Sequence, residues 1–138
     1  HTFFFLVAHI RNRGEAQASF LSPMKTALAK GVKCTNHTDF NVAPIDQLLV
    51  VWSAVNRISR NGEPIGPEEC ITPYQSLQAI TSNAAYQYFE EDRKGSLKER
   101  KLADLVILDK NPLKVDPMEI KEIKVMETIK EGTTIYKK

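Results

Sequence analysis

The sequence predicts an α/β protein in two parts, and two observations carry that prediction. In the first part, apolar runs at residues 3–7 and 32–36 flank a helix-like segment at residues 22–30. The order strand, helix, strand is a β-α-β unit, which implies parallel strands joined by a right-handed crossover. Beyond about residue 94 the pattern of apolar residues changes from helical to strand-like, and Ile123, Val125 and Ile129 keep a period of two on one side.

Composition excludes several classes of protein. The 138 residues suffice for one domain with a hydrophobic core. A hydrophobic content of 42% with 26% charged residues excludes a disordered or membrane-spanning chain. The 19 basic and 17 acidic residues give a net charge of only +2, which argues against nucleic acid as a partner.

Cysteine usage indicates the compartment. Cys34 and Cys70 form no Cys-x-x-Cys pair, so we interpret them as free thiols in a reducing, cytoplasmic compartment, with a single disulfide as the less favoured alternative. The apolar opening at residues 2–8 is too short to span a bilayer, so no membrane partner is expected. Because the chain begins with His1 rather than Met, one interpretation is that it is a piece of a longer protein.

Each element of the first part has a local signal. The aromatic-rich run at residues 3–7 predicts a strand covered on both faces. Ser22 and Pro23 are expected at the N-cap and first position of a helix that ends at Gly31. Residues 32–36 then form the second strand.

Two further helices are expected. Residues 45–59 carry an apolar stripe at helical spacing, in which Trp52 is interpreted as a packing residue rather than a ligand-binding surface. Residues 72–75, Thr-Pro-Tyr-Gln, predict a helix start with a capping box. The buried face of this last helix is expected to comprise Leu77, Ile80, Ala84 and Tyr88.

The second part is predicted to be β structure. The charged stretch that ends at Gly95 marks the boundary. Residues 105–108 predict a buried strand, which the turn-forming residues 109–112 stop. Residues 123–136 predict a hairpin with its turn at residues 130–132.

The candidate site lies directly after the second predicted strand, at His37-Thr38-Asp39. Site residues collect at such strand ends, so Asp39 is the leading candidate for chemistry. The alternative for Asp39 is a turn-former or helix cap. Residues two apart in a strand point the same way, so His37 is placed to support Asp39, unless it is a buried histidine satisfied by the backbone. The same alternation puts Cys34 on the opposite face from His37.

Four motifs together resemble one enzyme family. They are residues 36–39 (Asn-His-Thr-Asp), residues 72–85 from Thr-Pro to Asn-Ala-Ala, residues 95–97 (Gly-Ser-Leu) and residues 101–109 (Lys-Leu-Ala-Asp-Leu-Val-Ile-Leu-Asp). In this order they closely resemble the C-terminal third of the amidohydrolase superfamily, in particular the amidohydrolase-3 branch of metal-dependent hydrolases. The resemblance covers nearly the whole chain.

The resemblance implies a fold. The family has a (β/α)8 TIM barrel and a small β-sandwich domain built from both chain ends. By that resemblance, residues 1–93 are the last strands and helices of the barrel, with residues 32–36 as its eighth strand. Residues 94–138 are the C-terminal strands of the composite β domain.

The resemblance also implies an activity, the hydrolysis of non-peptide or cyclic amide C–N bonds in a small-molecule substrate by a metal-activated water. It makes Asp39 a metal ligand and proton shuttle, and it places His1 and His37 at the substrate. A divalent metal, with zinc as the leading candidate, is implied for the complete enzyme, but this chain need not bind one by itself. No His-x-His pair occurs here, and a catalytic zinc takes three protein ligands plus water. The chain is therefore expected to be inactive alone.

Two other interpretations remain open. The chain could be a non-catalytic remnant that forms a homo-oligomer or binds a partner through exposed strand edges. It could also be a small independent enzyme that uses Asp39, His37 and Cys34. The second is the weaker interpretation because alternation separates Cys34 from His37.

Overall fold

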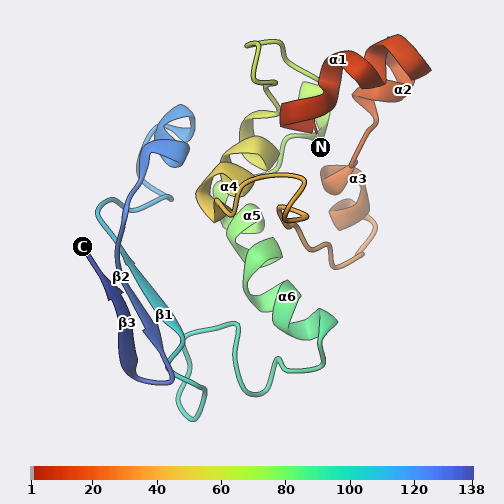
Figure 1. The fold of residues 1–138 in the computed structure, drawn as a ribbon. Coiled ribbons are helices and arrows are strands. Elements are labelled where there is room, and N and C mark those ends of the chain that lie inside the picture. Colours follow the sequence, from red (N-terminus) through yellow and green to blue (C-terminus); the bar gives the residue numbers. More distant parts are fainter. Residues whose placement is uncertain (1) are drawn as a thin grey trace.

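The computed structural model describes residues 2–138, apart from the side chains of Thr2, Leu6 and Val7. Six α-helices gather on one side and a three-stranded sheet lies on the other (Figure 1). The helices are α1 (Thr2–Arg13), α2 (Glu15–Ser19), α3 (Met24–Ala29), α4 (Gln47–Asn56), α5 (Pro73–Ile80) and α6 (Ser82–Gln87). The strands are β1 (Leu105–Leu108), β2 (Val125–Lys130) and β3 (Thr133–Lys137), and two 3-10 helices, η1 (Pro67–Glu69) and η2 (Pro117–Glu122), complete the elements.

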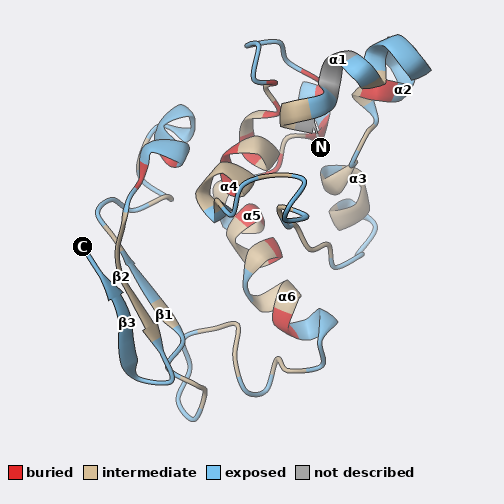
Figure 2. Ribbon diagram, viewed as in Figure 1, coloured by how far each residue is buried: buried red, intermediate tan, exposed pale blue. Residues whose placement is uncertain are grey.

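The hydrophobic core is built around α4. Val51, Trp52 and Val55 of this helix are buried together with Ile120 of η2, and Figure 2 shows the buried residues gathered along these elements. The Trp52 indole Nε1 donates a 3.0 Å hydrogen bond to the Met118 carbonyl, which satisfies its one polar group. Trp52 is thus a packing residue, as predicted, and it joins the helices to the connection between β1 and β2.

The predicted β-α-β unit is wrong. Residues 3–7 lie within α1, and residues 32–38 form neither a helix nor a strand. A continuous apolar run cannot by itself distinguish a buried strand from a helix, and α1 satisfies its own backbone where no neighbouring strand is present. Phe3 meets the Trp52 ring edge-on, with the ring centroids 5.8 Å apart, so this run still contributes to the core.

The helix signals were correct in type but not in every detail. The capping box at the start of α5 forms as predicted, with Thr72 and Gln75 bonded to each other's backbone N–H groups. Ser22 is not a cap: its backbone turns left-handed with φ 52°, and α3 begins only at Met24. The last helix breaks at Thr81 into α5 and α6, which leaves Tyr88 71% exposed instead of buried.

The predicted strand at residues 105–108 and the predicted hairpin both form, but β1 is not the buried strand that was expected, because Val106 is 57% and Ile107 47% exposed. The three strands form one antiparallel sheet in the order β1-β2-β3, and Lys130 pairs with Thr133 across the predicted hairpin turn. Glu131 and Gly132 occupy the turn with φ of 49° and 80°, the backbone of a tight hairpin. Both β1 and β3 are edge strands within the described chain.

Candidate active site

The irregular segment 32–38 leads to the candidate site residues and lies beside α5 and α6. Its backbone is held by the helices instead of by strands: the Asn36 N–H donates to the Ala79 carbonyl at 3.3 Å. The Asn83 side-chain amide donates to the Cys34 carbonyl at 2.9 Å. The polar triplet 37–39 therefore follows a segment with a fixed support.

Asp39 occupies a tight turn at the end of this segment. Its φ is 52°, and its carbonyl accepts a 2.6 Å hydrogen bond from the Val42 N–H. The turn-forming alternative thus holds for its backbone. The helix-capping alternative does not, because Asp46 caps α4 by accepting the Leu49 N–H at 2.9 Å. The Asp39 side chain is exposed, and among the described residues its carboxylate accepts no hydrogen bond.

His37 is exposed and is not the buried, backbone-satisfied histidine of the alternative interpretation. Its Nδ1 accepts the Asp39 backbone N–H at 3.0 Å, so the neutral ring carries its proton on Nε2. One ring nitrogen therefore shapes the Asp39 turn, and the other can donate to a ligand.

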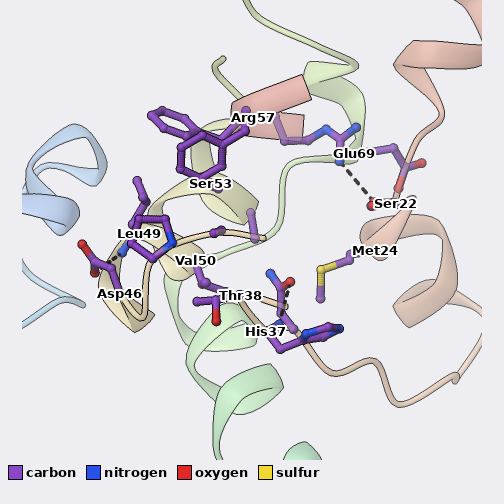
Figure 3. A pocket seen from close by; sticks show the side chains of 16 residues that line it. Ser22, Met24, His37, Thr38, Asp46, Leu49, Val50, Ser53, Arg57 and Glu69 are labelled. Carbon is purple, nitrogen blue, oxygen red and sulfur yellow. Dashed lines mark hydrogen bonds between the residues drawn. The ribbon is translucent and has the colours of Figure 1, made fainter. Parts of the chain in front are cut away.

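Two hollows meet at His37 and Thr38. The inner cavity, about 90 Å³ in volume, has Arg57 and Glu69 at one end and His37 and Thr38 at the other (Figure 3). The outer hollow, about 520 Å³ in volume, is lined by residues of α1 and α3 and by Cys34, His37 and Asp39. Cys34 and His37 both line the outer hollow, and the strand alternation that was expected to separate them does not apply, because the segment is not a strand.

At the buried end of the inner cavity, Arg57 and Glu69 make hydrogen bonds to distant segments of the chain that sequence analysis did not predict. Arg57 is 3% exposed, and its guanidinium donates to the carbonyls of Ile65 at 2.8 Å, Ser22 at 3.1 Å, Leu21 at 2.8 Å and Ser19 at 3.2 Å. Burial lowers its pKa from the usual value. Glu69 accepts the Thr26 hydroxyl and, at 2.9 Å, the Thr26 N–H, and these bonds hold the pKa of its carboxyl below its usual value. A single Arg after a helix and a Glu between two helices form no sequence pattern from which these hydrogen bonds could be predicted.

The described residues do not form a complete metal site. They contain no group of three or more His, Cys, Asp or Glu side chains placed to hold an ion. Asp39 is one donor of the right type, whereas a catalytic zinc takes three protein ligands. His1, predicted to contact substrate, lies outside the described residues. None of the described helices is long and apolar enough to cross a membrane.

Comparison with known proteins decides the family. The model of the amidohydrolase family matches residues 3–136, which is nearly the whole chain. The chain belongs to the amidohydrolase family. This confirms the resemblance drawn from the four motifs and places the chain in a family of enzymes.

Individual relatives agree with this assignment. YtcJ of Bacillus subtilis, which its name describes as an amidohydrolase, is 30% identical over 117 residues, covering 83% of this chain and 22% of YtcJ. The N-substituted formamide deformylase of Arthrobacter pascens is 29% identical over 127 residues, covering 91% of this chain and 23% of that enzyme. The imidazolonepropionase of Treponema denticola is 33% identical over 91 residues, covering 64% of this chain and 19% of that enzyme. The chain thus spans less than a quarter of the length of these relatives.

A solved structure supports the fold. The crystal structure of an amidohydrolase from Thermotoga maritima superposes with a TM-score of 0.63 at 21% identity, over 83% of this chain and 26% of that chain. At this identity the match concerns the fold alone. An arrangement of helices with a small antiparallel sheet is therefore part of a known amidohydrolase.

Proposed function

We propose that the whole protein containing this chain hydrolyses C–N bonds of amides or cyclic amides in small molecules. The observation that carries the proposal is the family match over residues 3–136. The name of one relative specifies an N-substituted formamide as the substrate, which is an amide of this class. The outer hollow of about 520 Å³ at Asp39 has the size of a small-molecule site.

Within that protein, residues 1–93 would form the last part of a (β/α)8 barrel, and residues 94–138 the C-terminal strands of a small β domain. The relatives support only that the chain corresponds to a part of a longer protein, since more than three quarters of each relative lies outside the matched region. Residues outside this chain would then supply the other catalytic groups. We therefore expect the chain to be inactive by itself.

Asp39 is the proposed general base. Its carboxylate is exposed in the outer hollow and free of hydrogen bonds from other described residues, so it can accept a proton from an attacking water. The water oxygen bonds to the carbonyl carbon, the C–N bond breaks, and the proton passes through Asp39 to the leaving nitrogen. His37 Nε2 lies free to donate to a substrate oxygen, because Nδ1 already accepts the Asp39 N–H.

A divalent metal, zinc being the first candidate, fits this proposal only in the whole protein. Asp39 would be one ligand, and the further donors would come from residues outside those described. No step of the reaction is therefore assigned to a metal.

The test uses the whole gene product with a panel of N-substituted formamides and cyclic amides. Asp39→Asn keeps the size of the side chain but removes the proton acceptor, so we expect kcat to fall by about 10²- to 10⁴-fold. Asp92→Asn, at an exposed aspartate, is the matched control and is expected to leave kcat unchanged. Wild-type turnover by the Asp39→Asn variant would overturn the role of Asp39, and a wild-type protein that cleaves no member of the panel would overturn the proposed reaction.

A further inference from the structure

The segment that leads to Asp39 is held by residues of α5 and α6. Asn83, Tyr86 and Gln87 are spaced at i, i+3 and i+4 in α6, which places them on one face of that helix, and Ala79 lies near the end of α5. Each contacts a different residue of the segment 33–36. The helices α5 and α6 therefore hold the segment 33–36 through four contacts.

The contacts follow the chain in order. The Lys33 Nζ lies 3.6 Å from the centre of the Tyr86 ring, a cation–π contact. The Asn83 amide donates to the Cys34 carbonyl at 2.9 Å, and the Thr35 hydroxyl donates to the Gln87 Oε1 at 2.8 Å. The Asn36 N–H then donates to the Ala79 carbonyl at 3.3 Å, three residues before Asp39.

These contacts replace a strand ladder. A buried or half-buried backbone group needs a hydrogen-bond partner, and residues 32–38 have no neighbouring strand in the described chain. The Asn83 amide supplies the partner for the Cys34 carbonyl, and Gln87 fixes the next residue one helical turn further on. A shift of the segment along the helix would break both bonds at once.

We infer that Asn83 is a positioning residue, which together with Gln87 fixes the position of the Asp39 carboxylate in the outer hollow. The inference rests on the proposed function, in which Asp39 takes the proton of the attacking water. Asn83 itself lines neither of the two hollows at His37, so it acts only through the backbone of the segment. Misplacing a reacting group by about 1 Å can cost about a hundredfold in rate, so a small displacement would be measurable.

The main test is a double-mutant cycle in the whole gene product. Asn83→Asp is isosteric but turns the amide donor into a carboxylate that repels the Cys34 carbonyl, and we expect kcat to fall about tenfold to a hundredfold with KM nearly unchanged. In the Asp39→Asn background the same substitution is expected to cost nothing more, because the group that Asn83 positions is already gone. Equal losses in both backgrounds would overturn the inference.

The outcomes separate this inference from the proposed function. If Asp39→Asn alone leaves turnover intact, the proposed function fails. If Asp39→Asn is impaired while Asn83→Asp is not, the proposed function stands and the positioning role fails. Asn61→Asp, at an exposed position in a turn, is the matched control for the change of charge and is expected to match wild type.

A second pair of variants covers the case in which Asn83→Asp does not fold. Gln87→Glu retains an oxygen that accepts the Thr35 hydroxyl, whereas Gln87→Met has similar length and only a weakly accepting sulfur. We expect Gln87→Glu to keep most of kcat and Gln87→Met to lower it several-fold, with the thermal midpoints of the two variants close together. Equal kcat values for the two variants would contradict a role for this contact.

Discussion

Single residues at the inner cavity show why charge can be buried in this chain. Arg57 follows α4 in a left-handed conformation with φ 49°, so its side chain turns back into the protein and reaches four carbonyl groups. Full use of its donors offsets much of the cost of burying a cation. Nearby, Glu69 binds the first turn of α3 through Thr26. Arg57 therefore holds the connection between α2 and α3, and Glu69 holds the start of α3, next to the hollows at Asp39.

The Glu69 contact makes stability depend on pH. Its folded-state pKa is depressed, first by the Thr26 hydroxyl and N–H, so its stabilising contribution is present above about pH 4.5 and is lost as pH falls through the lower folded-state value. Wild type is expected to lose thermal stability more steeply below that pH than Glu69→Gln. The measurement is the unfolding midpoint between pH 3 and 7, with Glu68→Gln as the control at a neighbouring exposed carboxylate. Parallel pH curves for wild type and Glu69→Gln would refute the assignment.

At the scale of elements, local signals decided which predictions held. The capping box of α5 and the turn of the β2–β3 hairpin depend only on neighbours in sequence, and both form as predicted. Whether the runs at residues 3–7 and 32–36 form strands depends on whether distant strands pair with them. The sequence of each run carries no information about such partners. The motif at residues 36–39 singled out Asp39 and His37, and both line the outer hollow, while their role in a reaction stays a prediction. The support by Asn83 could not be predicted, because 49 residues separate Asn83 from Cys34.

Gly95 joins the last helix to the sheet, and its role can be measured. Its φ is +84°, and an added Cβ would lie 2.5 Å from the Ala85 Cβ, so Gly95→Ala combines backbone strain with a clash. Gly132 is the matched control, because its φ is +80° while no atom lies within 4 Å of an added Cβ. Gly132→Ala is expected to cost about 1–2 kcal/mol from strain alone, and Gly95→Ala about 1–3 kcal/mol more.

Chemical denaturation of both variants gives these two free energies of unfolding. The difference between them isolates the packing of α6 against residue 95 from the backbone strain that they share. Equal losses would show that the contact with Ala85 relaxes without cost.

At the scale of the molecule, helices and sheet are connected through α4 and η2. Ile120 is fully buried against Val51, Trp52 and Val55, so the strands are tied to the helices by the connection between β1 and β2. Several large apolar side chains nevertheless remain exposed, including Phe89 at 90%, Leu97 at 84% and Phe40 at 64%. Contacts with the rest of a longer protein would cover such side chains. Their exposure is consistent with the proposal that the chain works as part of a longer protein.

Metal content and assembly of the isolated 138-residue chain test this view of the whole molecule. The described residues bring together no three metal-binding side chains, so the chain alone is expected to bind no zinc stoichiometrically and to be a monomer or an aggregate. Size-exclusion chromatography with light scattering and elemental analysis of the same fractions measure both properties, and Asp39→Asn serves as the control for non-specific metal. A defined oligomer with about one metal per chain, lost in Asp39→Asn, would contradict the expectation. It would mean that Asp39 and His37 from neighbouring copies complete a site between subunits, and the interpretation as an inactive part of a longer enzyme would then have to be abandoned.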